Sequence, residues 1–168
     1  MLGVNIGKNA TTPLEHALSD YQRCLVEVHP YAEYITVNLS SPNTPDLRQL
    51  QFGEALRRLV GTLRDECNRL DAKQGRKVPL VVKIAPDMTD DDLYAVADTL
   101  AEVSIDGIIA TNTTIDRSGL GGHPKASEAG GLSGLPIRDK STAIIQKLNA
   151  HLSGSIPIIG VGGVSDQH

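Results

Sequence analysis

Short apolar runs alternate along the chain with longer segments of helical periodicity. The runs span residues 2–6, 34–39, 79–84, 107–111 and 156–161. Polar or glycine-rich residues follow each run, and after the first four runs comes a segment whose apolar residues recur every three or four positions. This alternation predicts an α/β protein in which helices cover a sheet of buried parallel strands.

The expected helices cover residues 12–28, 53–72, a stretch that begins after Thr89, and residues 139–152. The first should begin with a capping box formed by Thr12 and Glu15, with a proline at its first helical position. Thr89 is the expected N-cap of the third helix.

Polar residues lie at or near the ends of four of the runs. They are Asn5, Asn38, Lys83, Thr111 and Asn112. In a (β/α)8 barrel the carboxyl ends of all strands converge on one pocket, whereas an open doubly wound sheet binds its ligand mainly at one switch point. A polar group at the end of each strand therefore favours the α/β class and the (β/α)8 TIM barrel.

The chain has fewer strand-like runs than a closed barrel needs. Taking Gly162–Gly163 as the end of strand seven makes the first run strand three, so we expect an incomplete barrel with about strands 3–7 present. Such a piece would have exposed strand edges and would be prone to aggregate in isolation.

Composition narrows the possible functions. The net charge of −4, without a cluster of Lys and Arg, gives no reason to expect a nucleic-acid partner. Cys24 and Cys67 lie in helical segments; neither belongs to a Cys/His cluster, so we predict no metal site and no disulfide. This cysteine usage favours a reducing, intracellular compartment. No apolar run reaches the roughly 18 residues of a membrane span.

The segment Ser40–Thr44 follows a strand and contains candidate chemistry. Pro42 and Pro45 restrict the backbone before them, and this fixes the directions of the Ser41 hydroxyl and the Asn43 amide. A capped surface turn is the alternative interpretation. No His–Asp pair stands at triad-like positions, so ordinary acyl-transfer chemistry is not indicated.

Lys83 interrupts an apolar strand, where an unpaired ammonium is costly to bury. Three interpretations remain open from the residues alone. The side chain could extend to solvent, act as a Schiff-base nucleophile as in aldolases, or stabilise an anion on a bound cofactor.

Glycines and asparagines complete the candidate site. Residues 130–134 and 160–163 are glycine-rich and fall where barrels commonly bind phosphate, although glycines can also serve only as flexible loop residues. Asn38, Asn43 and Asn112 each carry an amide that donates and accepts, which suits a planar imide-like ring better than a sugar phosphate. Alone, each asparagine could be a turn residue.

Six motifs resemble those of the class 2 dihydroorotate dehydrogenases, in the order of that family. They are residues 4–9, 38–44, 82–87, 110–114, 130–134 and 160–163. The resemblance extends along the whole chain. It implies oxidation of dihydroorotate to orotate in pyrimidine biosynthesis, with FMN as the hydride acceptor and quinone as the final oxidant.

The resemblance also implies roles for individual residues. Ser41 matches the catalytic base, where class 1 enzymes have a cysteine, and Thr44 matches a residue that helps to pass the proton onward. Asn38, Asn43, Asn112 and Thr113 match substrate contacts, while Asn5, Asn38, Lys83, Thr111, Gly134 and Gly163 match FMN contacts. In this family Lys83 would stabilise negative charge on the flavin, which favours the anion role over the Schiff base.

The family pattern also contains N-terminal membrane-associating helices, two earlier strands and a C-terminal barrel unit, which we expect to be absent from residues 1–168. The expectation is that residues 1–168 form the central part of a single FMN-binding barrel domain. Membrane association, as a peripheral protein on the cytoplasmic side of the inner membrane, would come only from N-terminal helices. The isolated chain would be cytoplasmic and could be an inactive, incompletely folded fragment. Asp46 stands in the expected lid where many relatives have a glycine.

Overall fold

The computed structural model describes residues 1–165, which form a five-stranded sheet in the order β1-β2-β3-β4-β5. The strands are β1 (Gly3–Ile6), β2 (Tyr34–Asn38), β3 (Leu80–Ile84), β4 (Gly107–Ala110) and β5 (Ile158–Gly160). All four pairings are parallel, and each joins strands that are consecutive in the chain. This is the order of successive units of a (β/α)8 barrel, because a doubly wound sheet would reverse its strand order at a switch point.

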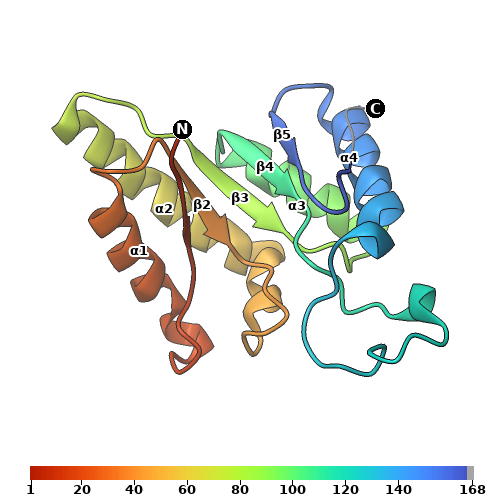
Figure 1. Cartoon of the computed structure of the whole chain (residues 1–168). Coiled ribbons are helices and arrows are strands. Elements are labelled where there is room, and N and C mark those ends of the chain that lie inside the picture. Colours follow the sequence, from red (N-terminus) through yellow and green to blue (C-terminus); the bar gives the residue numbers. More distant parts are fainter. Residues whose placement is uncertain (166–168) are drawn as a thin grey trace.

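The helices form an outer layer that follows the curve of the sheet (Figure 1). They are α1 (Ala17–Val28), α2 (Gly53–Gln74), α3 (Asp90–Glu102) and α4 (Arg138–Leu152). Each packs against the next, α1 on α2, α2 on α3 and α3 on α4. Single 3-10 turns lie in the loops, at Leu14–His16, Leu47–Gln51, Ser118–Leu120 and Leu135–Ile137. The strand-then-helix order predicted from the sequence is confirmed.

The two faces of the sheet have different surroundings, because successive side chains of a strand point to opposite faces. The helix-facing residues join the main apolar core; they include Ile35, Val37, Leu80, Val82 and Ile108. The residues between them lie on the other, concave face; they include Thr36, Asn38, Val81, Lys83 and Ile109. Asn38 is in register with Lys83, and Lys83 with Ile109, so these three share the concave face.

Two helix starts test the predicted capping. Thr89 is the N-cap of α3, and its side chain accepts a hydrogen bond from the Asp92 amide at 3.2 Å, as predicted. The predicted capping box at Thr12 is wrong. Pro13 is extended (φ −57°, ψ 152°), a 3-10 turn follows it, and α1 begins only at Ala17 without a side-chain cap.

The two ends of the sheet are called the rim and the base below. The rim comprises the loops that follow β2, β3 and β4, residues 39–52, 85–89 and 111–137. The base comprises the segments that lead into β2, β3 and β4, residues 29–33, 75–79 and 103–106, with the adjoining end of α2. Within residues 1–165, no helix has both the length and the apolar character that a membrane crossing requires.

One sequence-based expectation is wrong at the base. Cys67 does belong to a Cys/His cluster, because α1 and α2 both end there and bring it within 4.8 Å of His29 and Asp71, measured between potential ligand atoms. His29 Nε2 lies 2.8 Å from Asp71 Oδ1, whereas Cys67 Sγ donates to the Val78 carbonyl outside the group at 3.4 Å. His29 Nδ1 is buried without a hydrogen-bond partner within residues 1–165. Burial raises the pKa of the Cys67 thiol to about 11.

Candidate active site

Three side chains, from the ends of β2 and β4 on either side of β3, are hydrogen-bonded to one another at the rim. Asn112 Nδ2 donates to Asn38 Oδ1 at 3.1 Å and to Ser40 Oγ at 2.9 Å. Ser40 Oγ in turn donates to the Lys83 carbonyl at 2.7 Å, and the Thr113 amide donates to Asn112 Oδ1 at 2.9 Å. The structure therefore brings the predicted Asn38 and Asn112 into direct contact and fixes which way each amide points.

Sequence reasoning missed Ser40, which is completely buried at the centre of this network. Its motif contains two adjacent serines, and nothing in the sequence shows which hydroxyl is buried. The structure resolves the ambiguity. Ser40 joins the strand ends, whereas Ser41 is only partly buried and faces a neighbouring pocket.

Lys83 faces a small cleft beside this network. Thr111, Asn112 and Thr113 line it together with Lys83, and Ser133, Ile137, Val161 and Gly162 complete the lining. Within residues 1–165, Lys83 Nζ makes no hydrogen bond or ion pair, although its main-chain carbonyl does. An ammonium so placed can stabilise negative charge on a ligand in the cleft.

Ser41 and Thr44 line an adjacent pocket, together with Arg48 and Ile115. Ser41 Oγ accepts a hydrogen bond from the Asn43 amide at 3.2 Å. This bond is the local contact of a serine-capped turn, which is what the alternative interpretation of the segment predicts.

The glycine-rich loop lies between the two pockets. A Cβ atom on Gly131 would lie 1.9 Å from Thr113 Oγ1 and 3.1 Å from Pro42 Cγ, so only glycine fits there. Gly130 lies beside Asn43, where a Cβ atom would be in ordinary van der Waals contact, 3.6 Å from Asn43 Oδ1. The predicted residues Asn43 and Thr113 therefore border one junction, although 70 positions separate them in the numbering.

The two glycines predicted at the phosphate site also meet. Gly134 (φ 77°) and Gly163 (φ 72°) both adopt the left-handed region, and a Cβ on Gly163 would lie only 2.7 Å from the Gly134 carbonyl oxygen. This close approach demands glycine at position 163.

Asn5 is the predicted residue that the structure leaves apart. It lies on the edge strand β1, in register with Thr36, and its side chain is exposed. No hydrogen bond joins that side chain to another residue in the described part of the chain. Its position one strand beyond Asn38 places it on the concave face, at the border of the site.

Two charged residues of the rim, Arg48 and Asp87, were also missed. Asp87 accepts hydrogen bonds from Arg48 at 2.9 Å and from Lys140 at 2.7 Å. Burial by itself would raise the pKa of Asp87, but the bonds from Lys140, Thr114, the Ile115 amide and Arg48 outweigh it and lower the pKa to about 2. Sequence signals for both residues were weak, since each lies in a loop where charged residues are common.

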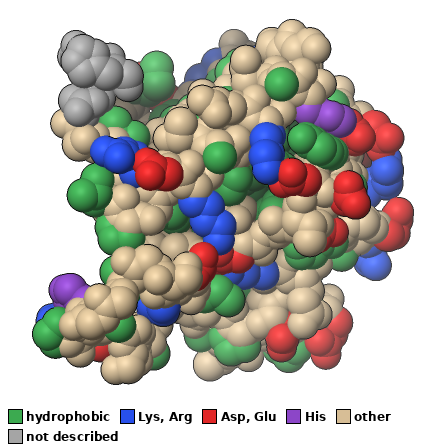
Figure 2. Space-filling view, turned by 90° about the vertical axis from the view of Figure 1, so that its right-hand side faces the viewer, with side chains coloured by type: hydrophobic (Ala, Val, Ile, Leu, Met, Phe, Trp, Pro, Cys, Tyr) green, Lys and Arg blue, Asp and Glu red, His purple; other side chains and the backbone are tan. Residues whose placement is uncertain are grey.

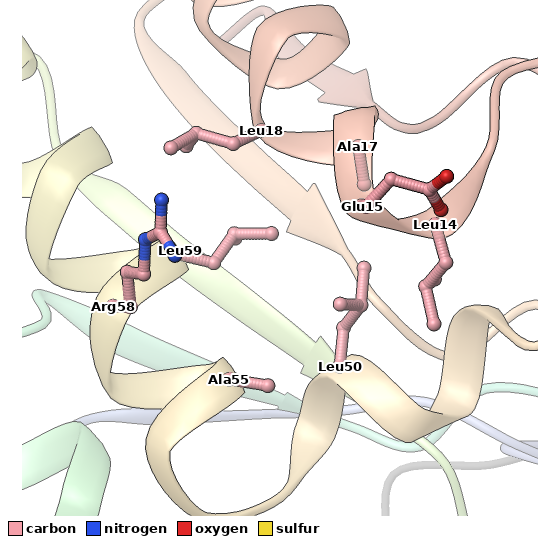
Figure 3. Close-up of a pocket in the computed structure, with 8 residues that line it drawn as sticks. All are labelled: Leu14, Glu15, Ala17, Leu18, Leu50, Ala55, Arg58 and Leu59. Carbon is pink, nitrogen blue, oxygen red and sulfur yellow. The ribbon is translucent and has the colours of Figure 1, made fainter.

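A separate pocket of about 410 Å³ lies between the starts of α1 and α2 (Figure 3). Leucines dominate its lining, with Leu14, Leu18, Leu50 and Leu59 around the cavity and Arg58 on one side. None of the predicted site residues lines this pocket, so the candidate chemistry stays at the rim.

Comparisons with known proteins show which family the chain belongs to. The family model for dihydroorotate dehydrogenase matches residues 1–167. The curated dihydroorotate dehydrogenase (quinone) of Saccharophagus degradans is 58% identical over 164 residues, covering 98% of this chain and 48% of that protein. That of Cellvibrio japonicus is 58% identical over 166 residues, with 99% and 48% covered.

Solved structures give the same result. The structure of the Eimeria tenella dihydroorotate dehydrogenase in complex with ferulenol superposes with a TM-score of 0.92 at 36% identity, covering 98% of this chain and 47% of that one. The chain thus spans about half the length of the relatives it matches. With the motifs, the strand order and these matches in agreement, the chain belongs to the dihydroorotate dehydrogenase family.

Proposed function

We propose that this chain supplies most of the substrate-binding rim of an FMN-dependent barrel that oxidises (S)-dihydroorotate to orotate, with quinone as the final acceptor. The observation that carries the proposal is the position of Lys83, whose side chain lines a cleft together with Asn112 and whose ammonium has no partner among residues 1–165. The relatives that match at 58% identity are named as quinone-dependent enzymes of this activity.

The residues present fit a bound flavin phosphate. A cationic side chain on the concave face, Lys83, would hold the flavin ring, and Thr111 lines the same cleft. The tightly apposed Gly134 and Gly163 would receive the phosphate end through main-chain N–H groups. Asn5 and Asn38 would complete the contacts to the ring. When bound, FMN supplies a hydride acceptor.

The neighbouring polar groups would bind and deprotonate the substrate. Asn38 and Asn43 offer amide groups that would pair with an imide-like ring. Asn112, whose Nδ2 donates to Asn38 and Ser40, would exchange one of these bonds for the substrate, and Thr113 follows it. Ser41 would take the proton from C5 of the substrate, and Thr44, which lines the same pocket, would pass it on. The segment after Ser41 would act as a lid that keeps water from the reacting carbon atoms.

The proposal also covers the electron acceptor and the cellular location. We infer that the enzyme transfers electrons to quinone as a peripheral protein at the cytoplasmic face of the inner membrane. The printed names of the curated relatives support the quinone. Fractionation of cells that express the full gene, followed by an assay of quinone reduction in washed membranes, tests both points.

A chimera provides a direct test of the reaction. The aligned 164 residues of this chain would replace the matching segment of the Saccharophagus degradans relative, so that a whole barrel is present. We expect stoichiometric FMN and anaerobic bleaching of its absorbance by dihydroorotate. Ser41→Ala should keep FMN but slow bleaching about 100-fold, because a positioned base is lost.

Matched variants make that test decisive. Ser19→Ala, an exposed serine on α1, should leave the bleaching rate unchanged. A chimera that binds no FMN, or one in which Ser41→Ala reacts at the normal rate, would contradict the proposal. Titration of the chain alone with FMN, together with a thermal melt, separates a folded binding unit from an inactive fragment.

A further inference from the structure

Asp87 connects the loops after β2, β3 and β4 with one another and with α4 through its carboxylate. It lies in the loop after β3, and its side chain is only 15% exposed. Arg48, from the loop after β2, donates to Oδ2, and Lys140, from α4, donates to Oδ1. The Thr114 hydroxyl donates to Oδ1 and the Ile115 amide to Oδ2, both from the loop after β4.

Arg48 extends this connection to the residues next to the candidate chemistry. Its Nε donates to the Ser40 carbonyl at 3.2 Å, and its Nη2 donates to the Thr113 carbonyl at 2.9 Å, while Nη1 binds Asp87. Ser40 immediately precedes Ser41, and Thr113 immediately follows Asn112. A planar guanidinium therefore sets the distance between the loop that carries the base and the loop that carries a substrate amide.

Both groups act through other residues. A carboxylate has about four lone-pair sites, and four donors from this chain already bind Asp87. The Arg48 guanidinium uses three of its five N–H groups, one on each nitrogen, for the Ser40 carbonyl, the Thr113 carbonyl and Asp87. Arg48 also lines the pocket of Ser41 and Thr44, so the three bonds that join the loops, and not complete saturation, are what support a positioning role.

We propose that Asp87 and Arg48 are positioning residues that hold the Ser41 loop and the Asn112–Thr113 loop at the spacing the reaction needs. The inference rests on the proposed function for its catalytic meaning, but the spacing itself can be measured without turnover. If the two residues had a purely structural role, their loss would only lower stability. If they position the loops, their loss must also change the substrate KM and the reaction rate of the folded enzyme.

The chain offers a close control for Asp87. Asp90 stands three residues later and also binds a lysine of α4, with Lys147 Nζ at 2.6 and 2.7 Å from its two oxygens. The Asp90 side chain is 58% exposed, and its hydrogen bonds within residues 1–165 go to Lys147 and not to the loops after β2 and β4. Figure 2 shows acidic and basic side chains next to one another on the face that it draws. Asp90→Asn therefore removes an exposed aspartate–lysine pair that makes no bond to these two loops.

The first readout is amide hydrogen exchange in the chimera with FMN bound. We expect Asp87→Asn and Arg48→Lys to speed exchange about tenfold or more in peptides that span residues 41–47 and 112–117, and not in peptides of α3. Arg48→Lys keeps the charge but cannot bridge two carbonyls and a carboxylate, so it isolates geometry from charge. Unchanged exchange in both loops would overturn the proposal, whether or not the chimera is active.

The second readout separates binding from chemistry. Well below the melting temperature, both variants should raise the dihydroorotate KM about tenfold and slow flavin reduction about tenfold, with the Kd for FMN within about threefold of the parent. Asp90→Asn should match the parent in every value. Normal KM and kcat in a merely less stable Asp87→Asn protein would overturn the proposal. An unsubstituted chimera that dihydroorotate cannot reduce would instead refute the proposed function, with hydrogen exchange still deciding the spacing.

Discussion

The rim and the base each contain a carboxylate with a similar environment but different partners. Asp87 at the rim and Asp106 at the base are 15% and 17% exposed, and each binds two cations and one main-chain amide. Asp106 binds Arg64 of α2, Lys77 and the Leu80 amide at the start of β3. Asp106 therefore fixes how a helix meets the sheet, whereas Asp87 fixes how loops meet one another.

The ends differ in which polar groups lack a hydrogen-bond partner within residues 1–165. At the base, His29 Nδ1 and Arg64 Nε are buried without a partner, although His29 Nε2, Cys67 and Asp71 bind one another or nearby main-chain groups. At the rim, Lys83 Nζ has no partner, and the Lys83 side chain is partly exposed and lines a cleft. The unpartnered atoms of the base are thus enclosed by protein, whereas Lys83 is accessible to a ligand.

The largest expected effect separates lysines from the two ends. Lys83→Met should slow flavin reduction in the chimera about 100-fold or more, because a preorganised positive charge would be lost from the cleft. Lys77→Met, at the exposed partner of Asp106, should leave the rate unchanged. Stopped-flow bleaching by dihydroorotate measures both. Borohydride trapping of a substrate adduct at Lys83 would contradict the electrostatic role.

The second-largest expected effect is a loss of stability caused by a substitution at the base. Asp106→Asn should lower the free energy of unfolding of the chimera by about 2 kcal/mol, since it leaves Arg64, 9% exposed, without its anionic partner. Urea denaturation measures the change, and Glu54→Gln at an exposed position should change it by less than about 0.5 kcal/mol. Slower flavin reduction in folded Asp106→Asn protein would contradict the prediction that the base affects stability and not the reaction.

Acid should weaken the rim through Asp87. Its folded-state pKa of about 2 lies below the ordinary 3.8, so the ionised carboxylate stabilises the fold above about pH 4. That contribution, about 2 kcal/mol, should be lost as the pH falls from about 4 to about 2. Urea denaturation across this range should show a shallower pH dependence for Asp87→Asn than for the parent. Equal slopes would mean that Asp87 is not held by its donors.

The smallest effect compares two positive-φ residues, Asp46 at the rim (φ 59°) and Ser104 at the base (φ 55°). Replacement of either by glycine should relieve left-handed strain and raise stability by about 0.5 kcal/mol. Only Asp46→Gly should alter the flavin-reduction rate, by about twofold or less, because position 46 lies in the expected lid. Thermal melts and stopped-flow traces test the pair; an equal kinetic effect from Ser104→Gly would contradict the assignment.

Local sequence patterns explain which elements of the fold could be predicted from the sequence. The apolar runs and helical repeats identified the five strands and four α-helices of residues 1–165, because burial of one face imposes its period on the sequence. The glycine-rich segments 130–134 and 160–163 and the polar strand ends were also visible in the sequence, whereas the choice of Gly134 and Gly163 within those segments came from the resemblance to the family. The start of α1 was misjudged because an extended Pro13 and a 3-10 turn replaced the capping box.

The features that could not be predicted from the sequence depend on long-range contacts. The sequence alone determined a parallel α/β architecture, the polar strand ends and the candidate residues Ser41, Lys83 and Asn112. Only the tertiary structure decided that Ser40 is the buried serine and that Asp87 joins three loops, because these facts depend on residues dozens of positions apart. Hydrogen bonds between loops leave no periodic signal in a sequence, and the folded chain is what brings their donors and acceptors together.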